Sequence, residues 1–369
     1  MVSAHRRFSP GQSRQGNTAR TGACTLRYQI IIGLLMAVLA GQAQSAETPG
    51  PKLWDVKTPA QLVGAAAKVG KDGGTIRLAP GQYLISKPIV FKGRNRVNIT
   101  GSGWDTEIKM TGKGDALVFE DCGHCCIRDL MITGSKNAGS GVVFKGACGS
   151  DTVDFCRIAE FPVSGIRFEG PKTGSQSSNT VSRCHFIGNL GDQLYSYNNN
   201  DFYILQNQFG THGGNPKTGA RLDHSSAGTY SMNYHWGNVV AFRLGPNSHF
   251  NRIENNRFEN SLKEGVIIGG PEGWSCMLNI FTGNTVHTNS MSESGKYPAV
   301  TATNTTSLTF TSNQVFSWNS DSVKHSSSLI IGPGCKGWIV KDNIFGSNTG
   351  KGLIYEEGKD HIVKDNLGE

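Results

Sequence analysis

Short segments of the form polar-x-apolar recur along most of the chain at a nearly constant spacing. The apolar members of successive segments lie a mean of about 27 residues apart, a period typical of repeat architectures in which each repeat is one supersecondary unit. The segments are Asp129-x-Met131, Cys156-x-Ile158, Cys184-x-Phe186, Asn207-x-Phe209, Tyr234-x-Trp236, Asn256-x-Phe258, Asn284-x-Val286, Asn313-x-Val315 and Asn343-x-Phe345.

Each segment is followed by a second strand-like one, often opened by glycine. Two or three short strands in about 27 residues form one coil of a parallel solenoid, in which each coil completes the backbone hydrogen bonds of the one before it. The sequence therefore predicts an all-β, single-domain parallel β-helix. The second segments are Val142–Phe144, Ile166–Phe168, Leu194–Ser196, Ala220–Leu222, Val240–Phe242, Val266–Ile268, Val300–Ala302, Leu329–Ile331 and Leu353–Tyr355.

The polar residue of the first segment is expected at a corner of the coil. Asparagine tolerates the left-handed backbone conformation and can hydrogen-bond to the asparagine of the next coil. Cys156 and Cys184 occupy the same corner, so packing explains them. Residues 58–69 predict a short amphipathic helix, with Thr58 as its cap and Pro59 at its first position. This helix would close the open end of the solenoid.

The N-terminus indicates export. Five arginines and no acidic residue precede the apolar run 30–39, and small residues follow it. This predicts a cleaved signal peptide over 1–45 and a β-helix domain over 46–369, secreted or periplasmic, with an uncleaved anchor as the alternative. Without the five arginines the formal net charge falls from +8 to +3, which removes the main argument for nucleic-acid binding. After cleavage no stable membrane insertion is expected.

The cysteines give no clear indication of a metal. Cys122-x-x-Cys125-Cys126, with His124 inside it, invites a zinc interpretation, but no second pair at ligand spacing follows,. Disulfides or packed thiols are the favoured interpretation. We therefore predict no metal site and no cofactor, with calcium left open.

The N-terminal strands carry a family resemblance. The string G-G-T-I-R-L-A-P-G-Q-Y-L-I-S at 73–86, I-T-G-S-G at 99–103 and the later N-x-F coils resemble the pectate-lyase-like superfamily of right-handed parallel β-helices. The resemblance covers nearly the whole mature chain. It implies a right-handed coil and a polysaccharide substrate, whereas the lyases, hydrolases, epimerases and phage tailspikes of this superfamily catalyse different reactions or none.

Strand alternation assigns the outer face of the second strands. The residues between the apolar ones form two columns, one containing Arg167, Tyr195, Arg221 and Ala241, the other Glu169, Tyr197, Asp223 and Arg243. His224 follows at the strand edge. Five of these residues are the candidate catalytic groups, namely Tyr197, Arg221, Asp223, His224 and Arg243. The candidate substrate-binding groups are Arg167, Glu169 and Tyr195, with Lys217 and Lys263 from the preceding turns.

This patch has the chemistry that uronates need. Arginine binds and neutralises a carboxylate, and tyrosine or histidine can move the adjacent proton. The leading hypothesis is a lyase, or a related epimerase, acting on an anionic polysaccharide. A glycoside hydrolase that uses Glu169 and Asp223, two coils apart, is the alternative. A non-catalytic glycan-binding surface protein is a third, because charged ladders also arise from ordinary cross-strand pairing. The oligomeric state stays open.

Overall fold

A computed structural model describes residues 52–211, 214–318, 325–346, 354–357 and 359–368. The predicted signal peptide at 1–45 lies outside these residues. The described residues belong to one compact unit, Pro51–Glu369. None of their helices is long and apolar enough to span a membrane.

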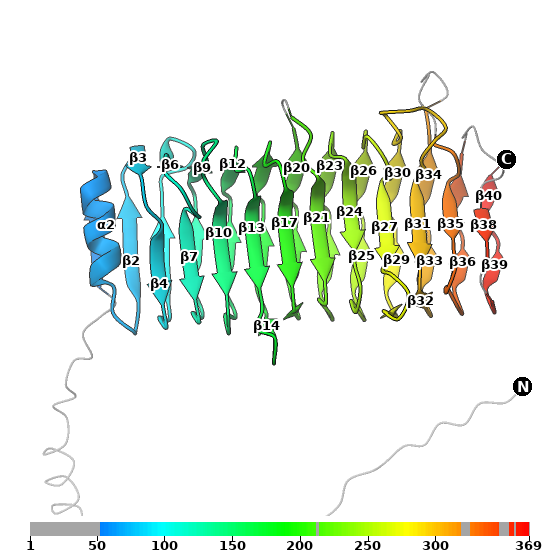
Figure 1. Cartoon of the computed structure of the whole chain (residues 1–369), viewed down its shortest axis with the longest axis horizontal. Coiled ribbons are helices and arrows are strands. Elements are labelled where there is room, and N and C mark those ends of the chain that lie inside the picture. The colour runs from blue at the N-terminus through cyan, green and yellow to red at the C-terminus, as the bar shows by residue number, and fades with distance from the viewer. Residues whose placement is uncertain (1–51, 212–213, 319–324, 347–353, 358, 369) are drawn as a thin grey trace, which may run out of the picture. The chain divides into compact units, whose positions relative to one another are not determined.

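The unit is a parallel β-solenoid, as the repeat predicts. Each coil contributes one strand to each of three parallel sheets, here numbered 1 to 3 in the order in which a coil passes through them (Figure 1). The strands of one sheet follow one another along the solenoid in chain order. Each strand therefore pairs with the strand one coil earlier and the strand one coil later, and almost all of the sheet pairing is long-range.

Sheet 1 consists of β4 (Ile89–Lys92), β7 (Leu117–Glu120), β10 (Ser140–Lys145), β13 (Ser164–Glu169), β17 (Asp192–Tyr197), β21 (Thr218–Asp223), β24 (Val240–Leu244), β27 (Val266–Gly269), β31 (Val300–Thr303), β35 (Leu329–Ile331) and β38 (Ile354–Glu356). Sheet 2 consists of β1 (Leu53–Val56), β2 (Gly74–Leu78), β5 (Val97–Thr100), β8 (Cys126–Arg128), β11 (Thr152–Asp154), β15 (Thr180–Ser182), β19 (Tyr203–Leu205), β22 (Thr229–Ser231), β25 (Arg252–Glu254), β29 (Ile280–Thr282), β33 (Thr309–Thr311), β36 (Ile339–Lys341) and β39 (Ile362–Lys364). Sheet 3 consists of β3 (Gly81–Ile85), β6 (Thr106–Met110), β9 (Met131–Thr133), β12 (Arg157–Ala159), β16 (His185–Ile187), β20 (Gln208–Gly210), β23 (Tyr234–Trp236), β26 (Arg257–Glu259), β30 (Thr285–His287), β34 (Gln314–Phe316), β37 (Ile344–Phe345) and β40 (Leu367–Gly368). Two further pairs are formed by β14 (Gln176–Ser177) with β18 (Asn199–Asn200), and by β28 (Cys276–Met277) with β32 (Thr305–Thr306).

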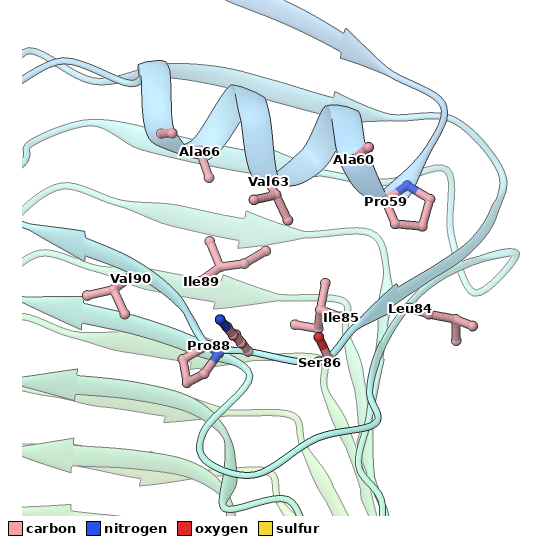
Figure 2. Close-up of a pocket in the computed structure, with 12 residues that line it drawn as sticks. Pro59, Ala60, Val63, Ala66, Leu84, Ile85, Ser86, Pro88, Ile89 and Val90 are labelled. Carbon is pink, nitrogen blue, oxygen red and sulfur yellow. The ribbon is translucent and has the colours of Figure 1, made fainter.

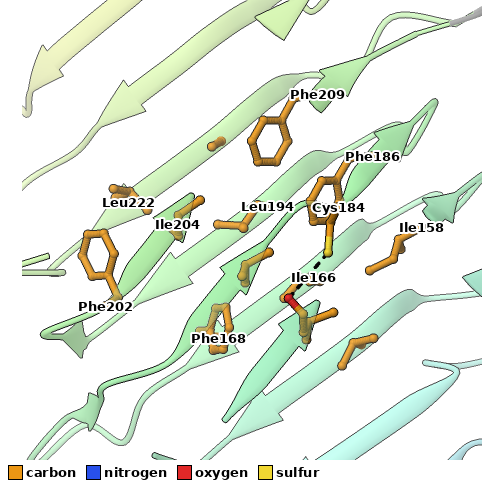
Figure 3. Close-up of a cluster of buried hydrophobic side chains, with 14 of the residues drawn as sticks. Ile158, Ile166, Phe168, Cys184, Phe186, Leu194, Phe202, Ile204, Phe209 and Leu222 are labelled. Carbon is orange, nitrogen blue, oxygen red and sulfur yellow. Dashed lines mark hydrogen bonds between the residues drawn. The ribbon is translucent and has the colours of Figure 1, made fainter. Parts of the chain in front are cut away.

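The core runs along the inside of the three sheets as stacks of equivalent side chains. Phe91, Phe119, Phe144 and Phe168 stack with successive ring centroids 5.0, 5.0 and 5.1 Å apart. This spacing follows from in-register parallel strands, which lie about 4.8 Å apart. Figure 3 shows apolar side chains from all three sheets meeting in the same interior.

A ladder of asparagines forms the corner between sheets 2 and 3. The Oδ1 of Asn256 accepts hydrogen bonds from the backbone N of Asn233, at 2.9 Å, and from its Nδ2, at 3.1 Å. Asn284 does the same for Asn256, and the pattern continues to Asn366. The predicted ladder is confirmed, but the residue before each asparagine adopts the left-handed conformation instead, as Asn255 does with φ 56°. The corner thus uses two neighbouring residues, one for the left-handed backbone conformation and the next, the asparagine, for the hydrogen bonds of the ladder.

Two of the predicted corners are displaced by one residue. The inward residue of β9 is Ile132, which pairs with Ile158, and the inward residue of β23 is His235, which pairs with Phe258. Met131 and Trp236 were expected at these places, and both lie on the outer face instead. His235 is buried and stacks on Phe209, with ring centroids 4.6 Å apart. A search for apolar residues passes over an inward histidine, so it assigns the inward position of β23 to the neighbouring Trp236.

The cysteines are packed thiols throughout the described residues. Cys122, Cys125, Cys148, Cys156, Cys184, Cys276 and Cys335 are buried and Cys126 is partly exposed, and none of them forms a disulfide. Cys156 and Cys184 occupy the corner that asparagine fills in later coils, as predicted. The backbone N of Cys184 donates to Asn207 Oδ1 at 2.9 Å, so the ladder begins at this thiol.

The predicted cap is helix α2 (Pro59–Lys68), at the blue end of Figure 1. Thr58 caps it by accepting a hydrogen bond from the backbone N of Gln61 at 3.3 Å, and Leu62, Ala65 and Ala66 are buried. An apolar hollow of about 590 Å³ remains between α2, β3 and β4, lined in part by the half-exposed Val63 (Figure 2).

We expect Asn256→Ala to lower the free energy of unfolding by about 1–3 kcal/mol, because it removes the acceptor of the buried Asn233 backbone N and the side-chain donor to the buried Tyr230 backbone O, both in the preceding coil,. Urea unfolding followed by circular dichroism measures this. Asn255→Gly is the matched control, because glycine adopts positive φ without strain and Asn255 is exposed. Equal losses in the two variants would contradict a structural role for the ladder.

Candidate functional site

The outer face of sheet 1 brings together most of the predicted site residues. In one column Arg167, Tyr195, Arg221 and Arg243 follow one another on β13, β17, β21 and β24. In the next column Glu169, Tyr197 and Asp223 follow one another on β13, β17 and β21. The predicted two-coil separation of Glu169 and Asp223 is confirmed.

The predicted alignment of β24 is wrong by two residues. Arg243 pairs with Arg221 and thus lies in the arginine column, not beside Asp223. Ala241, expected on the outer face, is buried. Strand alternation is unchanged by a two-residue shift, so the pattern predicts that Arg243 points outward but does not determine its neighbour. In the observed alignment the guanidinium groups of Arg221 and Arg243 are direct neighbours in the same column.

Arg221 is the centre of the site. Its Nη2 lies 2.5 Å from Asp223 Oδ2 and its Nη1 lies 3.9 Å from Asp192 Oδ2. Its guanidinium lies over the ring of Tyr195, 5.3 Å from the centroid. Although burial alone would lower it, the pKa of Arg221 is raised by the hydrogen bond to Asp223 and by the charges of both carboxylates. Arg221 therefore stays charged and separates two acids.

Asp192 is a site residue that the sequence analysis missed. It begins β17 and faces a hollow of about 270 Å³ whose lining includes Arg167, Tyr195, Lys217 and Arg221. Its side chain is 13% exposed. Burial raises the pKa of this carboxyl, and the hydrogen bond from Thr218 and the charge of Arg221 offset only part of the effect. A carboxyl group in this state can hold a proton closer to neutral pH than an exposed one.

Alternation could not have found Asp192, because the chain bends at the start of β17. Gln193 and Leu194 are both buried although they are adjacent in sequence. The in-out pattern read backwards from Tyr195 would therefore place Gln193, and not Asp192, on the outer face. The only indication in the sequence is an acidic residue just before a predicted strand.

Arg243 and Arg167 differ in their partners. Arg167 forms an ion pair with Glu169 on its own strand, so its charge is balanced. Arg243 forms no ion pair within the described residues, and its buried Nε has no hydrogen-bond partner there. An uncompensated guanidinium beside a second one is a site for an anion.

An aromatic group lies at the other end of β21. His224, directly after the strand and with φ 51°, contacts Tyr197 with ring centroids 5.0 Å apart. Trp274, from the turn after β27, meets His224 edge-on at 5.2 Å and is 43% exposed. The analysis of the sequence did not identify Trp274. Its exposed ring can stack on a sugar next to the charged groups.

The two predicted lysines have separate surroundings. Lys217 lines the hollow around Asp192. Lys263 is exposed, and its ammonium lies over the ring of Tyr297 at 5.6 Å. Lys263 does not line the hollow, and its role in the site stays a prediction. In the part of the chain that the structure describes, no group of three or more His, Cys, Asp or Glu side chains could hold a metal ion.

Comparison with solved structures shows the fold. The A-module of the Azotobacter vinelandii mannuronan C-5 epimerase AlgE6 is 14% identical with a TM-score of 0.62, over 84% of this chain and 95% of that one. The alginate lyase of Paenibacillus sp. FPU-7 is 15% identical with a TM-score of 0.53, over 75% of this chain and 98% of that one. The Dettilon tailspike protein is 11% identical with a TM-score of 0.64, over 84% of this chain and 64% of that one.

These likenesses confirm the predicted right-handed parallel β-helix fold. No protein-family model and no curated protein matches the sequence. At identities of 11–15% the solved structures establish the fold and leave the reaction to the chemistry of the site,.

We expect Asp192→Asn and Asp223→Asn to change stability in opposite directions at neutral pH. The raised pKa of Asp192 means that folding disfavours its charged form. Its contribution to stability is therefore present below its unfolded pKa and lost as the pH rises through the folded one. Asparagine carries no charge at any pH, so Asp192→Asn avoids the cost of burying a carboxylate. The variant should therefore be more stable than the wild type at pH 7, and the difference in stability should shrink as the pH falls.

Asp223→Asn is the matched control. It weakens the 2.5 Å contact with Arg221 and should cost about 1–3 kcal/mol. Thermal and urea unfolding between pH 4 and pH 8 measure both effects. A destabilised Asp192→Asn variant at neutral pH would show that Arg221 holds Asp192 in its charged form.

Proposed function

We propose that the protein is an exported enzyme that cleaves an anionic, uronate-containing polysaccharide by β-elimination at the outer face of sheet 1. The observation that carries the proposal is the uncompensated guanidinium of Arg243, one coil from Arg221. Such a group can bind the carboxylate of a uronate bidentately and neutralise it as the adjacent proton leaves.

The charges around the hollow support an anionic ligand. Arg167 and Arg221 are paired with Glu169 and Asp223, whereas Lys217 in the lining of the hollow and Arg243, one coil beyond Arg221, add positive charge. A low-dielectric surface strengthens these attractions. Solved structures of the same fold include proteins named as acting on mannuronan and alginate, and this supports a polysaccharide as the ligand.

The acid and the base both line the hollow beside Arg221. In the proposed reaction the carboxylate of Asp192, whose pKa is raised by burial, removes the proton next to the uronate carboxylate. The electron pair forms the carbon–carbon double bond as the glycosidic carbon–oxygen bond breaks. The hydroxyl of Tyr195, whose ring lies against the guanidinium of Arg221, protonates the leaving oxygen, and both side chains exchange protons with solvent afterwards. Arg243 holds the carboxylate during this transfer.

Glycoside hydrolysis is a second candidate, favoured by one observation. Asp192 and Asp223 lie on either side of one guanidinium, and the pKa of Asp192 is raised by burial while Asp223 is ion-paired. Two carboxyl groups in unlike environments are the arrangement of a general acid and its partner base. The structure thus offers Asp192 as a better acid than the Glu169 of the predicted pair.

We expect Arg243→Ala to lower kcat for an acidic polysaccharide about 10²- to 10³-fold, because a preorganised charge on the reacting group is lost. The ultraviolet absorbance of unsaturated uronate products measures turnover on alginate, pectate and glycosaminoglycans. Arg252→Ala is the matched control, because Arg252 is exposed on sheet 2 in the same coil and should leave turnover unchanged.

The reaction products distinguish a lyase from a hydrolase and from a non-catalytic glycan binder. New reducing ends without unsaturation, lost in Asp192→Asn, would replace the lyase by the hydrolase. Binding without any product from the wild type would leave the protein as a non-catalytic glycan binder and overturn both.

A further inference from the structure

Sheet 3 carries a second cluster of reactive and aromatic side chains. Trp236, Glu259, His287 and Phe316 occupy equivalent outward positions on β23, β26, β30 and β34. Tyr234 and Arg257 pair in the adjacent column. This aromatic surface comprises Tyr234, Trp236, Arg257, Glu259, His287 and Trp318. None of it belongs to the site on sheet 1.

Its centre is a buried carboxylate on the outside of the sheet. Glu259 is 5% exposed, with His287 Nε2 at 2.7 Å, Arg257 Nη2 at 2.5 Å and the Tyr234 hydroxyl donating to its Oε1. Burial and the neighbouring carboxylate raise the pKa of Tyr234 to about 12. Although burial alone would raise it, the pKa of Glu259 is lowered by hydrogen bonds with His287 and Tyr234 and by the charge of Arg257. A desolvated ionic network is costly, and a merely solvent-facing strand does not need one.

Aromatic rings surround the carboxylate and remain accessible. The indole of Trp236 packs directly against Gly210, since a Cβ at Gly210 would be 2.0 Å from its ring atoms. Its ring is 4.9 Å from that of Tyr234 between centroids, and both side chains are partly exposed. Trp318 meets His287 edge-on at 5.9 Å and is 53% exposed. Flat rings beside fixed hydrogen-bonding groups are the combination that a pyranose needs, with its apolar face and its hydroxyls.

The aromatic surface lies at the same level of the solenoid as the site on sheet 1. Only residues 237–239 separate β23, which carries Trp236, from β24, which carries Arg243. The two surfaces are thus on either side of one short turn. A polymer held on sheet 1 can reach the aromatic surface within a few coils, each about 4.8 Å.

We propose that the aromatic surface on sheet 3 is a second binding site for the glycan chain, which it holds by ring stacking on Trp236 and Trp318 and by hydrogen bonds that the exposed guanidinium of Arg257 donates to sugar hydroxyls. This inference rests on the proposed function in one respect, the identity of the ligand as a polysaccharide. The charges of Arg257 and Glu259 balance, so the site recognises sugar rings and not net anionic charge. It keeps a long polymer on the protein while the groups on sheet 1 act.

The test is affinity gel electrophoresis of the full chain in gels that contain sodium alginate, polygalacturonate or dextran. All proteins carry Asp192→Asn so that no polymer is cut. Trp236→Ala and Trp318→Ala should each weaken binding of at least one of these polymers about three- to tenfold, the value of one aromatic contact. The loss should persist at about 0.5 M salt, which screens the charges on sheet 1. Trp318 is exposed, so its removal should leave the unfolding midpoint unchanged.

Trp104→Ala is the matched control, because Trp104 is 40% exposed, has Arg157 over its ring and meets His185 edge-on, but lacks the buried carboxylate. It should bind as the Asp192→Asn parent does. Unchanged binding in both Trp236→Ala and Trp318→Ala, an equal loss in Trp104→Ala, or no binding of any of the three polymers by the parent overturns the inference.

The inference and the proposed function fail separately. Without Asp192→Asn, the Trp318→Ala variant should turn over short oligosaccharides at the wild-type rate, because the groups on sheet 1 are untouched. Binding that depends on Trp318 in a protein that yields no product would overturn the proposed enzyme and leave the second site standing. Product formation by the wild type, with unchanged polymer binding in both tryptophan variants, would support the proposed enzyme and overturn the second binding site.

Discussion

Parallel, in-register stacking of coils is the constraint on which the rest of the structure depends. Each strand has both of its hydrogen-bonded neighbours one coil away, so the position of any side chain is set by the coil before it. The asparagine ladder makes this stacking specific, because the side chain of Asn256 bonds to groups of the preceding and of the following coil. An asparagine displaced by one residue would leave the buried backbone N of the preceding coil without its acceptor and the Oδ1 of the following asparagine without one of its donors, at a cost of a few kcal/mol,.

The same register builds both surfaces. Residues 22–26 positions apart in sequence come within one strand spacing on sheet 1, as Arg221 does with both Tyr195 and Arg243. On sheet 3 the register aligns Trp236 with Glu259 and His287. A solenoid of this kind produces extended rows of side chains and not a deep pocket. Such rows suit a long, repetitive ligand.

The two surfaces manage charge in different ways. On sheet 1 Arg221 is shared by two carboxylates, while Arg243 has no acidic partner among the described residues and keeps its charge available to an anion. On sheet 3 Glu259 is held by Arg257, His287 and Tyr234, and aromatic rings provide the accessible area. One surface therefore favours ligand charge, and the other favours the ring of a sugar.

The sequence by itself determined the β-helix, its cap at Thr58, the asparagine corner and the outward direction of Arg167, Tyr195, Arg221 and Arg243. These depend on periodicity and alternation, which are local properties of the chain. The tertiary structure decided which residues become neighbours. Arg243 lies beside Arg221 and not beside Asp223, which alternation could not show because a two-residue shift leaves alternation unchanged. His235, and not Trp236, is the inward residue of β23, which the apolar pattern could not show because histidine does not count as apolar. Asp192 entered the site because the chain bends at Gln193 and Leu194. Turn lengths and bends are set by packing between coils, and no single segment of the sequence contains that information.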